Sequence, residues 1–96
     1  MIRVEGARLY VSGPATLANA AQLLEEARAP LAGGVSAVDL SGVTELDSSL
    51  LAVLFAWMRA AQARGGRLAV AHLPGELESL AQLYGVAGLL PQEAAS

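Results

Sequence analysis

The segment VDLSGVTELDSS, residues 38–49, passes from a short apolar run through a polar turn into an Asp-Ser-Ser triplet. The apolar residues that follow predict a helix, so Asp47, Ser48 and Ser49 stand at a helix N-terminus. Backbone N–H groups lack intrahelical partners there, and the helix dipole is positive. The sequence therefore predicts a turn that would accept a phosphate or an acidic group of a partner.

The segments around this turn alternate between strand and helix patterns. Short or alternating apolar runs predict four strands: residues 2–5, 9–11, 37–40 and 67–71. Apolar residues at helical spacing predict three helices: residues 17–28, 48–63 and 76–84. Gly6 marks a hairpin turn between the first two strands, and Pro30 with the glycine pair 33–34 ends the first helix.

Strands that alternate with helices imply parallel pairing through right-handed crossovers. We therefore expect an α/β fold with a single domain over residues 1–91. Its sheet has four strands and is mostly parallel, with an amino-terminal hairpin and three helices mainly on one face. Residues 92–96 are expected to fray.

Charge and composition exclude several kinds of function. The net charge is −3 and the 6 basic residues are scattered, which is not the footprint of a nucleic-acid-binding protein. There is no cysteine, which excludes disulfides and thiolate chemistry. The N-terminus lacks the apolar region of a signal peptide, and the longest apolar run, residues 50–58, is too short to span a membrane. We expect a cytoplasmic protein.

The triplet at the helix start has several interpretations. Asp and Ser are both favoured helix caps, so either Asp47 or Ser48 is expected to cap this helix. Ser48 is also a candidate phosphorylation site, and the turn is a candidate contact surface for a partner. A serine nucleophile would need a general base within hydrogen-bond reach, but the single histidine, His72, ends a different strand. We therefore predict no catalytic residue.

Asp39 is unusual because it lies within an apolar strand, where a carboxylate needs hydrogen bonds. We expect backbone amides of a loop to supply them. Glu45 and Asp47 add further carboxylates, but no calcium-type loop and no histidine cluster accompany them, so no metal site is predicted. The glycine pairs 33–34 and 65–66 do not fit a phosphate-binding loop, and no cofactor is predicted.

The predicted central helix is apolar on nearly every side between residues 50 and 58. Its helical spacing gives one face with Leu51, Leu54, Phe55 and Met58, and a second face with Leu50, Val53 and Trp57. Both faces cannot contact the same sheet, so one of them is expected to be exposed or to meet another subunit. The alternative is that neighbouring helices cover both faces. The hydrophobic fraction of 54% is also high for so small a domain.

The strand and helix order, with residues 38–43 followed by Leu46-Asp47-Ser48-Ser49, resembles the STAS domain family. Nearly the whole chain is covered by this resemblance. The likeness is greatest to the MlaB-type domains, the small cytoplasmic subunits of Mla phospholipid-transport ABC complexes, which maintain outer-membrane lipid asymmetry. The segment 80–86, followed by Leu89-Leu90-Pro91, looks like the carboxyl-terminal end of those subunits.

The resemblance implies a non-enzymatic adaptor that binds the ABC transporter ATPase and, through it, the membrane permease. It assigns partner binding to the second helix and its head, namely Asp47, Ser48, Ser49, Leu50, Leu51, Leu54, Phe55 and Met58. The same apolar surface would also allow a homodimer in isolation.

A second function that the resemblance implies is that of an anti-sigma-factor antagonist switched by phosphorylation of Ser48. Such antagonists carry a serine or threonine directly after the aspartate, where Ser48 stands in this chain. They usually have glycine two residues later, and Leu50 stands there instead. A bulkier leucine would hinder a kinase, so the sequence favours the adaptor.

Overall fold

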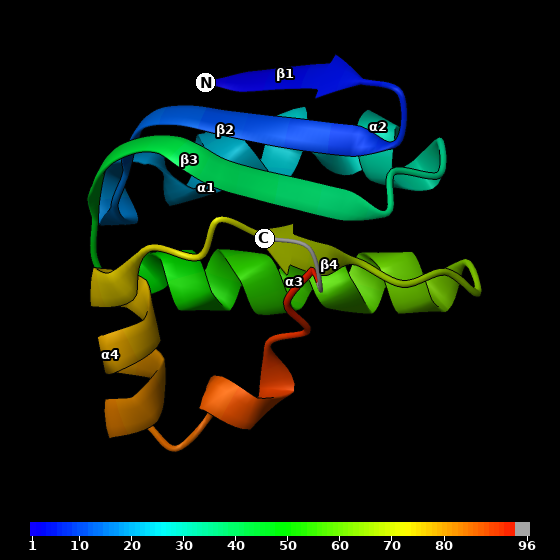
Figure 1. Cartoon of the computed structure of the whole chain (residues 1–96). Coiled ribbons are helices and arrows are strands. Elements are labelled where there is room, and N and C mark those ends of the chain that lie inside the picture. The colour runs from blue at the N-terminus through cyan, green and yellow to red at the C-terminus, as the bar shows by residue number, and fades with distance from the viewer. Residues whose placement is uncertain (94–96) are drawn as a thin grey trace.

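The order of the strands in the sheet follows the order of the chain, β1-β2-β3-β4. The computed structural model describes residues 1–93, and its elements are seen in Figure 1. These elements are β1 (Ile2–Glu5), β2 (Arg8–Ala15), α1 (Leu17–Glu26), α2 (Arg28–Ala32), β3 (Ala37–Leu46), α3 (Ser49–Ala63), β4 (Ala69–Ala71), α4 (Gly75–Leu83) and the 3-10 helix η1 (Ala87–Leu89).

The sheet has the expected mixed pairing. β1 and β2 form the antiparallel hairpin, and Gly6 in its turn has a φ of 60°, a conformation that glycine adopts without strain. β2, β3 and β4 pair in parallel. The predicted α/β class and the mostly parallel four-stranded sheet are confirmed.

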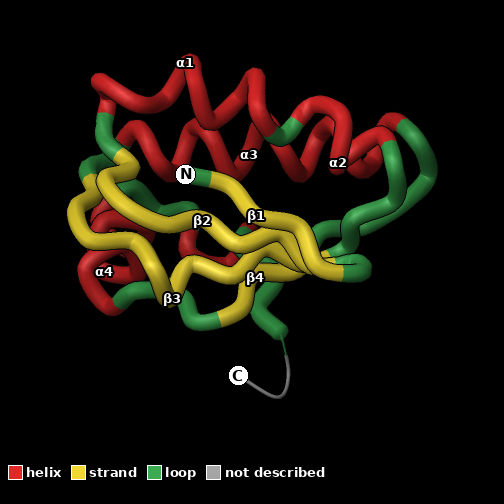
Figure 2. The backbone as a smooth tube through the Cα atoms, turned by 90° about the horizontal axis from the view of Figure 1, so that it is seen from above, coloured by secondary structure: helices red, strands yellow, loops and turns green. Residues whose placement is uncertain are grey.

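Helices α1, α2 and α3 lie on one side of the sheet, and α4 lies at its end (Figure 2). This arrangement follows from the connections, because right-handed crossovers from β2 to β3 and from β3 to β4 progress in the same direction across the sheet. The opposite face of the sheet carries no helix within residues 1–93. The sheet therefore has one face in the core and one open face.

The core forms where alternate strand residues meet the helices. Leu9 and Val11 of β2 and Val38 and Leu40 of β3 are each at most 1% exposed. Trp57 of α3 is also buried and belongs to the same hydrophobic cluster. A single core of this kind matches the one domain that the sequence predicts.

β3 is longer than predicted, because residues 41–46, expected as a polar turn, continue the strand. β2 also extends to Ala15, and the two strands pair as far as Ala15 with Leu46. Two register shifts bend this part of the ladder, and a Cβ on Gly42 would lie 3.0 Å from the carbonyl oxygen of Val11. The polar side chains of this stretch are tolerated because most of them face solvent.

Pro30 does not end the first helix. A second helix, α2, begins at Arg28 and includes Pro30 in its first turn. The first N–H groups of a helix have no intrahelical acceptor, so proline loses no hydrogen bond at this place. The glycine pair 33–34 ends α2 instead.

The last predicted strand and the last predicted helix differ only slightly from the structure. β4 begins at Ala69 rather than at residue 67, and α4 spans Gly75–Leu83. Gln92 and Glu93, which the sequence assigns to a frayed tail, lie beside β4, where the amide of Glu93 donates to the carbonyl of Val70 at 2.8 Å. The rest of the predicted tail, residues 94–96, lies outside the described residues.

Candidate partner-binding site

Asp47 provides the capping hydrogen bonds in the turn between β3 and α3. Its Oδ1 accepts a bond of 2.9 Å from the backbone N–H of Ser49 and a second bond from the hydroxyl of Ser49. Ser48 occupies the N-cap position of α3, but its side chain makes no capping bond. Of the two caps that the sequence allows, the structure therefore selects Asp47 and leaves the Ser48 side chain exposed.

The same carboxylate also holds the start of α1. Asp47 Oδ2 accepts a hydrogen bond of 3.0 Å from the backbone N–H of Leu17, the first residue of α1. The Ser49 hydroxyl bond, and after it the Leu17 and Ser49 amides, lower the pKa of Asp47 against the opposing effect of burial. One ionised side chain thus fixes the N-termini of two parallel helices.

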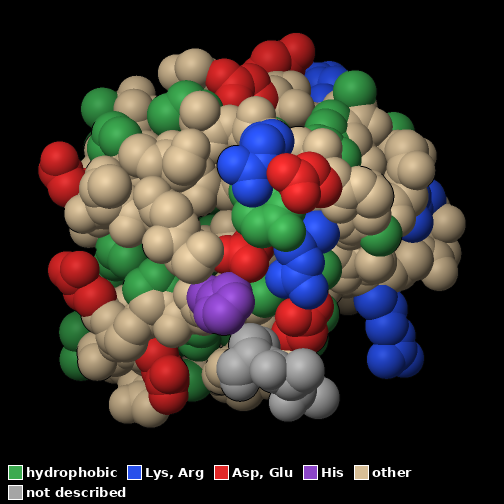
Figure 3. Space-filling model, turned by 45° about the horizontal axis from the view of Figure 1, so that its top comes forward, with side chains coloured by type: hydrophobic (Ala, Val, Ile, Leu, Met, Phe, Trp, Pro, Cys, Tyr) green, Lys and Arg blue, Asp and Glu red, His purple; other side chains and the backbone are tan. Residues whose placement is uncertain are grey.

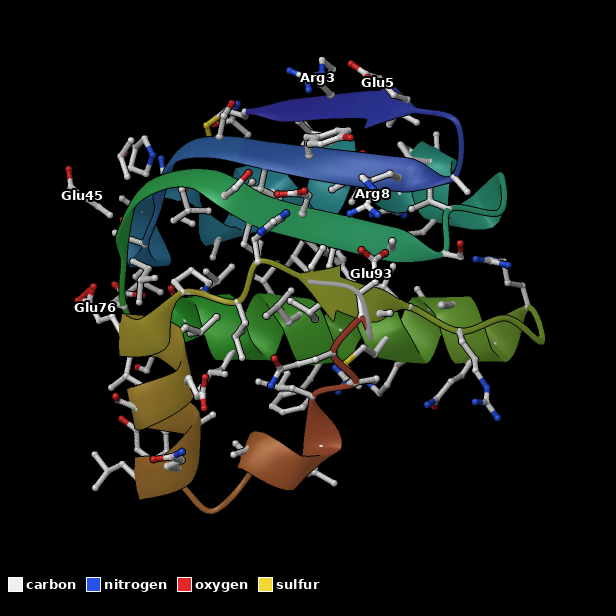
Figure 4. The ribbon with its side chains drawn as sticks, viewed as in Figure 1. Arg3, Glu5, Arg8, Glu45, Glu76 and Glu93 are labelled. Carbon is white, nitrogen blue, oxygen red and sulfur yellow. The ribbon has the colours of Figure 1, made fainter. Side chains whose placement is uncertain are left out.

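The end of the molecule around Ser48 is apolar and acidic. The Leu17 side chain is 75% exposed there. Figure 4 shows Glu45 and Glu76 at this same end, where β3 ends and α4 begins. Glu76 and Glu78 both stand in the first turn of α4. A protein that binds this end would need a basic or neutral surface, because acidic groups would meet like charge.

The prediction that a whole apolar face of the central helix is exposed is wrong for its leucines. Leu50, Leu51 and Leu54 are at most 5% exposed, and so are Val53 and Trp57 of the second face. Helices α1, α2 and α4 all contact α3, and its buried residues share one core cluster with the strands, so neighbouring helices and the sheet together cover these residues. The three buried leucines are core residues in this conformation, and they cannot contact a partner directly.

Phe55 and Met58 differ from those leucines, because they are only partly buried. They line a groove of about 480 Å³ between α3 and η1, together with Arg59, Gln62, Val86 and Leu89. Leu89 is 61% exposed, and Leu83 and Tyr84 at the end of α4 are also exposed. Sequence reasoning missed Val86 and Leu89, although both are apolar residues in the glycine-containing segment after α4.

Ser48, Phe55, Arg59 and Gln62 share one side of α3. Their spacings of seven, four and three residues are those of a helix face. The exposed serine at the helix head and the apolar groove farther along the helix therefore point in the same general direction. We call this combined surface, formed by Ser48, Phe55, Met58, Arg59, Gln62 and Leu89, the α3–η1 surface.

The open face of the sheet carries a separate charged cluster. Asp39 is 5% exposed, and its Oδ1 accepts a 2.9 Å bond from the backbone amide of Ser41. The predicted amide partner is confirmed, but it lies within β3 and not in a loop. Arg8 and His72 lie 3.5 Å and 3.7 Å from Asp39 Oδ2. Burial on its own would raise the pKa of Asp39, but the Ser41 bonds and these two neighbours together lower it.

Arg8 also binds the C-terminal segment. Its Nη2 donates to both oxygens of Glu93, at 2.8 Å and 2.7 Å, and this bond is the main cause that raises the pKa of Arg8. Figure 4 shows Arg8 on β2 and Glu93 facing one another across the open side of the sheet. Figure 3 shows acidic and basic side chains gathered beside the histidine on this face. The sequence did not reveal this pairing, because the two residues lie 85 positions apart.

The described residues hold no group of three or more His, Cys, Asp or Glu side chains suited to a metal ion. His72 faces Asp39, and it follows β4, which pairs only with the first part of β3. Ser48 follows the far end of β3. Ser48 and His72, the pair that a serine hydrolase would need, therefore lie at different places along the sheet.

The structure is thus an α/β domain with its helices on one face of a four-stranded sheet, and with an exposed serine that follows a capping aspartate. A family model described as the MlaB STAS domain matches residues 2–91. The chain therefore belongs to the STAS domain family, in its MlaB group.

Solved structures share this fold. A candidate anti-sigma factor antagonist from Thermotoga maritima has 16% identity and a TM-score of 0.74, with 96% of this chain and 83% of that chain covered. The anti-sigma factor antagonist SpoIIAA in its unphosphorylated form has 15% identity and a TM-score of 0.65, with 86% and 81% covered. Phosphorylated SpoIIAA of Bacillus has 14% identity and a TM-score of 0.67, with 98% and 90% covered. No curated protein sequence matches the chain.

Proposed function

We propose that the chain is a non-enzymatic adaptor subunit that binds the cytoplasmic ATPase of an Mla-type phospholipid ABC transporter and supports its assembly or activity. The observation that carries this proposal is the match of the MlaB family model to residues 2–91. Through the ATPase, the adaptor would be held near the membrane permease at the cytoplasmic side of the inner membrane. No helix within residues 1–93 is long and apolar enough to cross a membrane.

The α3–η1 surface is the docking site that the geometry supports. Phe55 and Met58 offer partly exposed apolar area, and Leu89 widens it from the other side of the groove. Such a patch beside polar residues is typical of a protein interface. The acidic end around Ser48 would add selectivity for a basic part of the ATPase.

An adaptor of this kind acts through differential affinity. If it binds the assembled or active conformation of the ATPase more tightly than other conformations, it increases the population of that conformation. The rigid attachment of α1 and α3 through Asp47 would present a preformed surface and lower the ordering cost of binding.

The test is co-purification of the tagged chain with the ATPase and permease from its native host. Leu89→Asp should weaken recovery of the ATPase by placing a charge in the apolar groove, and Ser48→Arg should weaken it by placing a positive charge where the acidic end would meet a basic part of the ATPase. Val4→Asp is the matched control, since Val4 is exposed on β1, away from α3. Recovery of the ATPase with all three variants would locate docking elsewhere, and failure to recover it with the wild-type chain would overturn the proposed function.

A second candidate function is an anti-sigma-factor antagonist controlled by phosphorylation of Ser48. The exposed serine at the head of α3 and the fold shared with SpoIIAA favour it. A phosphate would add charge beside Asp47 at a surface that already carries glutamates, which would weaken binding to an acidic partner. The genes beside this one give the first test: a serine kinase gene favours the antagonist, and transporter genes favour the adaptor. Where a kinase is encoded there, intact-mass spectrometry of the chain after incubation with that kinase tests phosphorylation of Ser48.

A further inference from the structure

A second groove lies between α3 and the helices α1 and α2. Ala56, Ala60 and Ala63 form one wall, and Leu24 of α1 and Leu31 of α2 form the other. The groove has a volume of about 530 Å³, within the usual range for small-molecule sites. Alanine side chains leave room beside the helix, and Leu24 remains 40% exposed, so the walls are apolar and open to solvent.

Two arginines stand at this groove, and one of them is held rigidly. Arg64 Nε donates to the carbonyl of Leu31 at 2.5 Å, and its Nη2 donates to the carbonyl of Val35 at 2.6 Å. These bonds fix the guanidinium and do not use Nη1. Arg28 is the second cation, and its partner Glu25 is an exposed side chain of α1.

Trp57 lies beneath this groove and carries a polar group that is unpaired within residues 1–93. The indole ring lines the groove and is 2% exposed, yet its Nε1–H has no hydrogen-bond acceptor among the described residues. Buried donors in proteins nearly always have an acceptor.

We propose that this groove binds a single-chain amphiphile with a carboxylate head, of the type of a free long-chain fatty acid. The alkyl chain would lie along the alanines of α3 against Leu24 and Leu31. The head would meet Arg28 and Arg64, because guanidinium groups bind carboxylates through strong, charge-assisted hydrogen bonds. Arg64, together with Arg28 once it exchanges its exposed partner Glu25 for the ligand, selects an anionic amphiphile over a cationic one. This site is separate from the α3–η1 surface and does not depend on the proposed partner.

Trp57 is the only tryptophan of the chain, so its fluorescence reports on the groove directly. The intact protein is titrated with dodecanoate below its critical micelle concentration, and with dodecyltrimethylammonium as the cation of matched chain length. We expect a saturable change in Trp57 emission with dodecanoate, and at least about tenfold weaker binding of the cation. No saturable change with dodecanoate, or equal binding of the two amphiphiles, would overturn the proposal.

Two variants separate the groove from general adsorption. Ala60→Phe fills the groove from an exposed position and should abolish binding, and Arg28→Gln should weaken dodecanoate binding about tenfold by removing one cation. Arg3→Gln, an equivalent change on β1, should leave binding unaltered. Equal binding by Ala60→Phe and the wild-type chain would overturn the site. Binding to phosphatidylglycerol vesicles without binding of free dodecanoate would likewise overturn it, in favour of a membrane surface.

Discussion

Asp47 Oδ2 accepts a 3.0 Å hydrogen bond from the backbone N–H of Leu17, 30 residues earlier in the chain. The other carboxylate oxygen holds the first residue of α3, so one side chain caps two helices that begin at the same edge of the sheet. Because Ser48 is the next residue, any charge or partner at Ser48 acts directly beside this double cap. The position of α1 is thereby linked to the region that we propose for partner binding.

Replacement of Asp47 should destabilise both helix starts. Asp47→Ala removes all three accepted bonds and should lower the melting temperature more than Asp47→Asn, whose single amide oxygen can keep the bonds of only one helix. Amide hydrogen exchange at Leu17 and Ser49 should accelerate together in the alanine variant. Glu45→Gln, an exposed neighbour, serves as the control. Unchanged exchange at Leu17 would show that the bond to α1 contributes nothing in solution.

Stability should decrease on acidification. The folded-state pKa values of Asp39 and Asp47 are both lowered, so the unfolded chain binds protons at these groups more readily than the folded chain. Their contribution is fully present above the ordinary aspartate pKa of about 4 and is lost as the pH falls through the lower folded-state values. Urea unfolding between pH 6 and about pH 2.5 measures this loss. The double variant Asp39→Asn and Asp47→Asn should lose less free energy of unfolding over this pH range than the wild-type chain. An equal loss would show that other groups cause the pH dependence.

Leu54 should behave as a core residue. It is fully buried on α3, so Leu54→Ala should lower the free energy of unfolding by about 2–5 kcal/mol through lost contacts and a cavity. Leu17→Ala, at a 75% exposed leucine, should change it by no more than about 0.5 kcal/mol. Urea unfolding of both variants provides the comparison. A small effect of Leu54→Ala on stability would instead support the surface role that the sequence suggested for this residue.

Local patterns in the sequence predicted the fold well, because the spacing of apolar residues differs between strands and helices. The alternation in residues 2–5 and the helical spacing in residues 17–28 and 48–63 each have one dominant interpretation. Glycine marked the turn at Gly6 for a physical reason, since the backbone there has a positive φ. The polar residues 41–46 misled the prediction, because their strand is defined by its neighbour β2 and not by burial of their own side chains.

The site was harder to predict because it depends on contacts between distant segments. The sequence located Asp47 and Ser48, whose roles are local to the start of α3. It could not show which neighbouring elements cover α3, so Leu50, Leu51 and Leu54 were assigned to a partner surface. The groove residues Val86 and Leu89 join Phe55 only after the chain has folded back along α3.

The contact of Arg8 with Glu93 should hold the C-terminal segment against β4. Arg8→Gln removes the guanidinium that donates to both Glu93 oxygens. Glu93→Gln removes the negative charge that pairs with Arg8. In either variant, hydrogen exchange should accelerate at the amides of Val70 and Glu93, which pair this segment with β4. The double variant should show the same exchange rates as either single variant, because all three lose the same single contact. Arg3→Gln, whose arginine pairs with exposed Glu5, is the matched control and should leave both amides protected.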